Sequence, residues 1–174
     1  MRIIGVDPGL NNTGYGVIET SGPEPRIVEG GVVRTRPSDP LEERLHTIFQ
    51  HISAVLAEMR PGAMAIEDLH SRPRFAKTAI LMGHARGVVV MAAGAAGIPV
   101  YDYQPTRAKN VVTGSGKAPK DQVMRAVASR LGDDGVTRNE HLADAFAIAL
   151  CHAIISGSPA AVAAAASKQP MTGW

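Results

Sequence analysis

The sequence predicts an α/β protein with about five strands. Three features indicate this class: short apolar runs that end in turn residues, longer stretches with helical spacing, and an order in which strands come first and then alternate with helices. Residues 3–6 form the first apolar run, which stops at Asp7 before Pro8 and Gly9. Residues 15–19 and 26–35 should form the next two strands, and the short connections leave no room for helices, so an antiparallel meander is expected.

A helix is expected after the meander. Asp39 is placed as its N-cap, Pro40 as its first helical residue and Glu42 as the partner that closes a capping box. Apolar residues then recur every three or four positions as far as Met59, so one face should pack on the sheet. The polar face is expected to be solvated, with Glu42, Glu43, Arg44 and Glu58.

Two further strands, at residues 63–66 and 100–103, should flank a second helix over residues 73–96. This helix contains the segment Gly83-His84-Ala85-Arg86-Gly87, whose small residues allow another backbone to approach closely. Glycine inside a helix costs about 1 kcal/mol relative to alanine, so a contact should offset it. Packing on the chain's own sheet and pairing with a second copy both remain open.

The last part of the chain predicts three helices. Residues 104–112 and 119–131 should form two of them, separated by a flexible Gly-Ser-Gly loop. A capping box from Thr137 to Glu140 should start the third. From residue 156 onward alanine, serine, glycine and proline dominate, so we expect one folded domain over residues 1–155 and a disordered tail over residues 156–174.

Composition limits the class of protein. A chain of 174 residues with 45% hydrophobic and 20% charged residues fits one globular domain. The net charge is only +2, so any nucleic-acid contact must depend on local basic clusters. Cys151 is the only cysteine, which excludes a disulfide framework and a thiolate metal cage. We find no signal-peptide pattern and no uninterrupted apolar run of membrane-spanning length, so a cytoplasmic protein without membrane contact is expected.

Four residues indicate a metal centre. Asp7 and Glu67 each follow a buried strand, where strands of one sheet can bring their ends together. His141 and Asp144 lie three residues apart in a helical stretch, so they should share one helix face. Alone, each has an ordinary structural explanation, such as a turn aspartate or a capping histidine. Together they predict a site of hard ligands for Mg²⁺ or Mn²⁺ that cleaves phosphodiesters with two metal ions.

Several segments resemble one known family. They are Gly5-Val6-Asp7-Pro8-Gly9, Ile66-Glu67, Gly83-His84-Ala85-Arg86-Gly87-Val88 and Ala143-Asp144-Ala145-Phe146-Ala147-Ile148-Ala149. In order and spacing, over residues 1–155, they closely resemble the RuvC family of bacterial Holliday-junction resolvases. The resemblance implies a ribonuclease H-like mixed sheet with helices on both faces, a homodimer, and symmetrical nicking of four-way DNA junctions. It also implies two Mg²⁺ ions per site, for which Mn²⁺ could substitute, and the junction-binding and motor proteins RuvA and RuvB as partners.

The resemblance also assigns roles to the four residues. Asp7, Glu67 and Asp144 match three of the family's metal-site residues, and His141 stands at the fourth position, where many relatives have aspartate. The site should therefore carry one negative charge less than in those relatives. His141 could bind the second ion or accept a proton from the attacking water, and the sequence leaves both roles open.

DNA contacts are expected in two regions. Lys109 and Lys120 match the family's phosphate-binding lysines, and Lys117 lies close to them in the sequence. In the segment after Glu67, His70 stands where relatives commonly have phenylalanine, and an imidazole can also stack on an unpaired base. The full set of expected DNA-binding residues is Lys109, Lys117, Lys120, His70, Arg72, Arg74 and Phe75.

Three other functions remain as alternatives. A phosphotransferase related to sugar kinases can open with a similar aspartate and glycine turn, but this chain has no GxxxxGK[ST] loop and is short for a two-lobed cleft. A non-catalytic junction-binding module would require the acidic residues to be dispersed, because clustered buried carboxylates are costly. A related nuclease could instead act on RNA/DNA hybrids.

Overall fold

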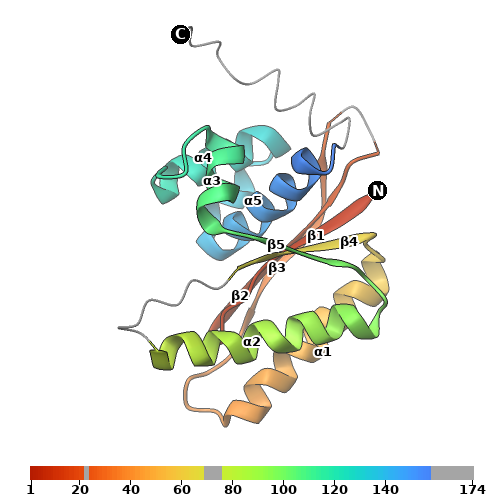
Figure 1. Cartoon of the computed structure of the whole chain (residues 1–174), viewed down its shortest axis with the longest axis vertical. Coiled ribbons are helices and arrows are strands. Elements are labelled where there is room, and N and C mark those ends of the chain that lie inside the picture. The colour runs from red at the N-terminus through yellow and green to blue at the C-terminus, as the bar shows by residue number, and fades with distance from the viewer. Residues whose placement is uncertain (22–23, 69–75, 158–174) are drawn as a thin grey trace, which may run out of the picture.

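The computed structural model describes residues 1–21, 24–68 and 76–157. A mixed sheet lies between two layers of helices, with strand order β3-β2-β1-β4-β5 (Figure 1). The first three strands are antiparallel, and β4 and β5 run parallel to β1. The strands are β1 (Arg2–Asp7), β2 (Asn12–Glu19), β3 (Arg26–Arg34), β4 (Ala63–Glu67) and β5 (Val100–Tyr103). The predicted antiparallel meander and the two further strands are confirmed, and the structure adds that these two strands run parallel to β1.

Helices cover both faces of the sheet. In Figure 1, α1 and α2 lie on one face, and α3, α4 and α5 lie on the other. Their bounds are α1 (Leu41–Met59), α2 (Ala76–Ala95), α3 (Pro105–Thr113), α4 (Lys120–Leu131) and α5 (Glu140–Ile155), with a 3₁₀ turn η2 (Asp134–Arg138) before α5. The predicted α/β class with a mixed sheet of about five strands is therefore confirmed.

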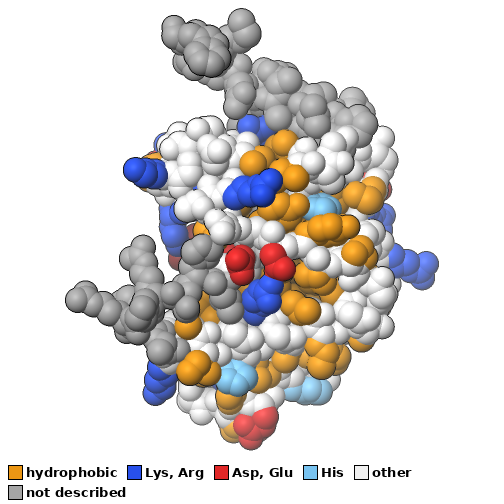
Figure 2. Space-filling view, in the orientation of Figure 1, with side chains coloured by type: hydrophobic (Ala, Val, Ile, Leu, Met, Phe, Trp, Pro, Cys, Tyr) orange, Lys and Arg blue, Asp and Glu red, His pale blue; other side chains and the backbone are white. Residues whose placement is uncertain are grey.

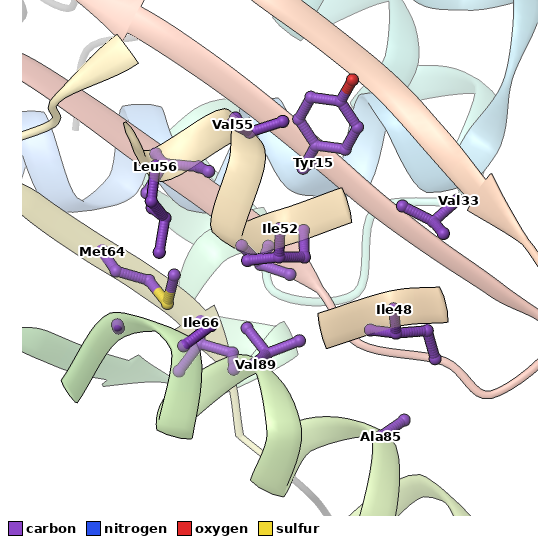
Figure 3. Close-up of a cluster of buried hydrophobic side chains, with 14 of the residues drawn as sticks. Tyr15, Val33, Ile48, Ile52, Val55, Leu56, Met64, Ile66, Ala85 and Val89 are labelled. Carbon is purple, nitrogen blue, oxygen red and sulfur yellow. The ribbon is translucent and has the colours of Figure 1, made fainter. Parts of the chain in front are cut away.

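Each face of the sheet has its own hydrophobic core. Between the sheet and α1, Ile48 and Ile52 are fully buried against strand residues such as Met64 and Ile66 (Figure 3). On the opposite face, Phe146 and Leu150 of α5 pack with Ile3 and Ile18. This two-sided burial explains why β1 is apolar at consecutive positions instead of alternating.

Glycines in β1 and β2 let α5 lie very close to the sheet. A Cβ added at Gly5 would lie 2.0 Å from the carbonyl oxygen of Ala145, and one added at Gly14 would lie 2.1 Å from that of His141. At Gly16 the added atom would lie 2.5 Å from the ring of Phe146. Because no other residue leaves this space, the three glycines fix how closely the first turns of α5 approach Asp7 at the end of β1.

The structure corrects two predicted helix starts. Pro40, not Asp39, is the N-cap of α1, and it makes no side-chain capping bond. At α5 the N-cap is Asn139 instead of Thr137, and its side chain accepts hydrogen bonds from two backbone N–H groups. The single side chain of Asn139 therefore satisfies two of the free N–H groups at the start of α5, and no capping box is needed.

Arg44 is also placed differently from the prediction. It was expected on the solvated face of α1, but its side chain is buried, with 9% exposed. Its Nε donates to Thr35 Oγ1 at 3.0 Å, and its Nη2 donates to Asn11 Oδ1 at 2.5 Å. Partners from two distant segments therefore hold a charged side chain that helical spacing alone assigned to solvent.

Helix α2 is unusually apolar for its exposure. Residues Lys77–Ala95 have a mean hydropathy of 1.3 and the length of a candidate membrane span, and 22% of that window is buried. The expectation that the chain has no uninterrupted apolar run of membrane-spanning length is not contradicted, because His84 and Arg86 interrupt this window. The predicted start of this helix at residue 73 and most of the predicted tail, residues 158–174, lie outside the described residues.

Candidate active site

Three elements bring the four predicted residues to one cavity. Asp7 ends β1 and Glu67 ends β4. These strands are parallel, and the pairing of Val6 with Ile66 places both carboxylates side by side at the carboxyl ends of the two strands. His141 and Asp144 come from the first turns of α5. All four line a cavity of about 270 Å³, together with Lys109 and Lys120. The sequence prediction that these side chains converge agrees with this geometry.

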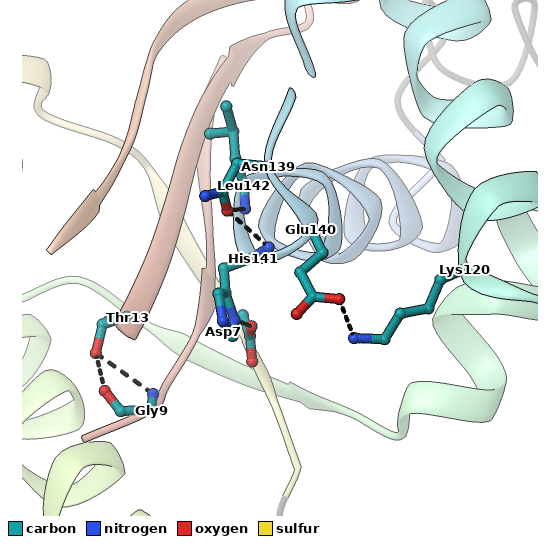
Figure 4. Close-up of polar contacts among 8 residues, drawn as sticks. All are labelled: Asp7, Gly9, Thr13, Lys120, Asn139, Glu140, His141 and Leu142. Atoms are coloured by element: carbon teal, nitrogen blue, oxygen red, sulfur yellow. Dashed lines mark hydrogen bonds and ion pairs between the residues drawn. The ribbon is translucent and has the colours of Figure 1, made fainter. Parts of the chain in front are cut away.

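Local bonds hold the segments that carry the site. Asn139 Oδ1 accepts from the backbone N–H groups of His141 at 2.9 Å and Leu142 at 3.2 Å, which fixes the start of α5 (Figure 4). In the turn after Asp7, Thr13 Oγ1 donates to the carbonyl oxygen of Gly9 at 2.7 Å. Short polar contacts therefore stabilise the start of α5 and the turn that follows Asp7, in addition to the glycine packing.

His141 and Asp7 are bonded to each other. The Nδ1 atom of His141 lies 2.9 Å from Asp7 Oδ2 (Figure 4). When Asp7 is ionised it can only accept hydrogen bonds, so Nδ1 then donates and Nε2 is the ring nitrogen left for a further partner. Within the described residues, no group of three histidine, cysteine, aspartate or glutamate side chains is arranged closely enough to hold a metal ion.

Burial and mutual repulsion make the carboxylates hard to ionise without a cation. Burial, followed by the charges of Asp7 and Asp144, raises the pKa of Glu67 to about 8. Burial also raises the pKa of Asp7, although the hydrogen bond from His141 acts in the opposite direction. The pKa of Asp144 is raised by burial and then by Asp7. A bound cation would offset the charge of these three carboxylates, so their chemistry suits hard divalent metals, although the side chains would have to move closer together to share an ion.

The predicted lysines are not equivalent. Lys109 and Lys120 line the cavity, and both lower the pKa of Glu67 by their charge. Lys120 also bonds to Glu140, and that bond raises its pKa. Lys117 instead lines a separate surface hollow with Arg107. The cavity therefore has two positive side chains at its rim, and a third lies farther along the same surface.

The expected contacts after Glu67 lie outside the described residues. This applies to His70, Arg72, Arg74 and Phe75. The sequence analysis placed Glu140 only in a capping box and missed its ion pair with Lys120. Its position in the first turn of α5, next to His141, was the available signal that it lies near the site.

Comparisons with known proteins bear on this geometry. The family model for the crossover junction endodeoxyribonuclease RuvC matches residues 3–152. The chain belongs to the RuvC family. The RuvC of Rhodopirellula baltica is 48% identical over 157 residues, which cover 90% of this chain and 88% of the relative. The RuvC of Pelotomaculum thermopropionicum is 40% identical over 153 residues, covering 88% of this chain and 93% of the relative.

Solved structures of RuvC proteins are also similar. The Thermus thermophilus RuvC in complex with a Holliday junction substrate has a TM-score of 0.85 and 38% identity, covering 92% of this chain and 97% of that chain. The yeast mitochondrial Holliday junction resolvase Ydc2 has a TM-score of 0.62 at 12% identity, over 95% of this chain and 80% of that chain, which supports the fold alone. The ribonuclease H-like fold expected from the sequence is confirmed by these RuvC neighbours.

Proposed function

We propose that this RuvC-family chain cuts four-way DNA junctions by metal-assisted hydrolysis of one phosphodiester in each of two strands. The observation that carries this proposal is the single cavity lined by Asp7, Glu67, His141 and Asp144, with two lysines beside it. Carboxylates paired with cations suit phosphodiester hydrolysis, and lysines suit backbone phosphates without reading sequence. Membership of the family and the likeness to a junction-bound relative support DNA junctions as the substrate.

Asp7, Glu67 and Asp144 would hold two Mg²⁺ ions, with Mn²⁺ as a workable substitute. When bound, such ions activate water and stabilise the leaving oxygen. The carboxylates that would hold the ions come from β1, β4 and α5, and Lys109 and Lys120, which line the same cavity, would bind the DNA backbone. Partial burial of the carboxylates lowers the dielectric constant around them, which would strengthen each of these electrostatic interactions.

His141 is proposed as the fourth member of the site, either as a metal ligand or as a proton acceptor for the attacking water. Its bond to Asp7 leaves Nε2 for either role. His141→Asp would supply a carboxylate ligand, and His141→Asn would keep a ligating oxygen but could not accept a proton. A ligand role predicts that His141→Asp keeps activity and that raised Mn²⁺ partly restores His141→Asn, whereas a proton-acceptor role predicts a loss in His141→Asn that added metal does not restore.

We also propose a homodimer that forms through α2. The exposed side of α2 carries Ile80, which is 61% exposed, and Met91, which is 55% exposed. Residues 80, 84, 87, 91 and 94 follow the alternating spacing of three and four that forms one stripe on a helix. At Gly87 and Gly94 an added Cβ would meet nothing within 4 Å. Figure 2 shows hydrophobic side chains and histidines along the band of surface where α2 runs in Figure 1.

A dimer would place two active sites around one twofold axis, which suits a junction of the same symmetry. Sedimentation of Met91→Glu, compared with Ile155→Glu as a control at another exposed hydrophobic residue, tests this surface. The α2 variant should sediment as a monomer and the control as a dimer. The proposal on the dimer surface fails when both variants remain dimers.

A cytoplasmic location and assembly with the junction-binding protein RuvA and the motor RuvB complete the proposal.

The substrate class is tested with a movable four-way junction, a linear duplex and an RNA/DNA hybrid, each with Mg²⁺, Mn²⁺ or a chelator. The proposal expects metal-dependent cutting of the junction by the wild type and no cutting by Asp7→Asn. Cutting of the hybrid would favour a ribonuclease, and junction binding without cutting would favour a recognition module. ATP binding in the same preparation would support the phosphotransferase alternative.

A further inference from the structure

A second cavity adjoins the proposed active site. Its volume is about 490 Å³, and it lies between the turn after β1, the start of α1 and the first half of α2. His141 lines both cavities, so they share one wall. The polar residues that line the second cavity are Asn11, Asn12, Arg44, Thr78 and His141.

The two cavities differ in charge. Three carboxylates line the first, whereas the described lining of the second includes no carboxylate and one guanidinium, that of Arg44. Arg44 is 9% exposed, and the ion pairs found among residues 1–21, 24–68 and 76–157 do not include it. An arginine is almost never buried to this degree without an anion, because the loss of hydration is costly.

The neighbouring amide is oriented by Arg44. A guanidinium only donates hydrogen bonds, so the bond from Nη2 fixes Oδ1 of Asn11 toward Arg44. The two N–H donors of the exposed Asn11 side chain are then left for a ligand. The hydrogen bond of Nε to Thr35 Oγ1 holds the guanidinium plane in place. The cavity therefore combines a buried positive charge with fixed donors, which is the chemistry that binds a phosphate group.

We propose that this cavity binds a second phosphodiester of the strand being cut, within a few nucleotides of the scissile phosphate, through Arg44 and Asn11. The proposal rests on the proposed function, because it assumes that the scissile phosphate occupies the neighbouring carboxylate site. Anchoring the same strand on both sides of His141 would fix where the scissile phosphate sits. Arg44 would then contribute binding and position without taking part in the reaction itself.

The test neutralises one phosphate at a time. Junctions carry a single methylphosphonate at one of the three positions on either side of the scissile phosphate, and binding is measured with a chelator so that nothing is cut. For the wild type, one position other than the scissile one should weaken binding about tenfold, the effect of a lost charge-assisted hydrogen bond. Arg44→Gln should weaken binding of the unmodified junction by a similar factor and show no further loss at that position.

Arg26→Gln is the matched control, since Arg26 is exposed at the far end of β3. It should retain the full wild-type response to the methylphosphonate. Additive losses in Arg44→Gln, or no sensitive position in the wild type, would overturn the proposal and leave Arg44 as a support for the turn. Where Arg44→Gln does not fold, Asn11→Asp takes its place, because it keeps an acceptor for Arg44 Nη2 and removes the two N–H donors proposed to hold the phosphate.

Failure of this proposal is distinguishable from failure of the proposed function. A wild type that binds and cuts the unmodified junction, yet shows additive losses in the variant, contradicts only the second phosphate site. A wild type that neither prefers nor cuts a junction contradicts the proposed function, and the second phosphate site is rejected with it.

Discussion

Glu67→Gln should stabilise the metal-free protein at high pH and abolish its activity. Burial, Asp7 and Asp144 raise the pKa of Glu67 from its ordinary value of 4.5 to about 8. The folded state therefore holds a proton that the unfolded state has released between these two pH values. Stability is lost as pH rises through this window, and the full cost is present above pH 8.

The size of the stability loss follows from the difference between the pKa of Glu67 in the unfolded and the folded protein. One pKa unit corresponds to about 1.4 kcal/mol, so the metal-free wild type should lose roughly 4 to 5 kcal/mol of unfolding free energy by pH 9. Glutamine has nearly the same shape and no charge to lose. The variant should therefore be more stable than the wild type by a few kcal/mol at pH 9 and about equal to it at pH 5.

Urea unfolding with a chelator at pH 5, 7 and 9 measures the difference. Glu43→Gln, at an exposed position of α1, serves as the control and should show no such trend. Addition of Mg²⁺ at pH 9 should stabilise the wild type and not Glu67→Gln. An equal difference between variant and wild type at pH 5 and pH 9 would refute the argument that ionisation of a buried carboxylate sets this cost.

Four other substitutions test the frame of the site and the lysines that line it. Gly14→Ala would place a Cβ 2.1 Å from the carbonyl oxygen of His141, so α5 would have to shift. The free energy of unfolding, measured by thermal unfolding, should fall by about 1 to 3 kcal/mol or more, and cutting should be impaired. An unchanged unfolding midpoint would contradict the packing argument. Asn139→Ala removes two capping bonds and should cost about 1 kcal/mol in the same assay, whereas no cost would show that the cap is dispensable. Lys109→Gln and Lys120→Gln should each lower the slope of log affinity against log salt for junction binding by about 0.9, and an unchanged slope would exclude a phosphate contact.

The carboxylates could be predicted because each depends on local structure. Asp7 and Glu67 follow buried strands, and the end of a strand is visible in the sequence as an apolar run that stops at a polar residue. The one-turn spacing of His141 and Asp144 likewise needs only a helix. Their meeting also required β1 and β4 to be neighbours in the sheet, and the local patterns did not specify this strand order.

Arg44 could not be predicted in the same way. Helical spacing placed it among solvated residues, but its partners Asn11 and Thr35 come from the turn after β1 and the end of β3. Such contacts depend on how segments far apart in the sequence pack, and local patterns carry no record of this. The close approach of α5 to Gly5 and Gly14 could not be predicted either. A glycine in a strand pattern indicates a weakened strand or a close neighbour, and the sequence does not say which.

The most direct test of the central claim maps the cuts in a single junction. The junction carries a different label on each of its four strands, and the wild type is compared with Asp7→Asn in Mg²⁺. Our account predicts two nicks at symmetrical positions in opposite strands, which a ligase can seal, and no nicks with the variant. Cutting that continues in Asp7→Asn, or cutting of linear duplex DNA at the same rate as the junction, would contradict it.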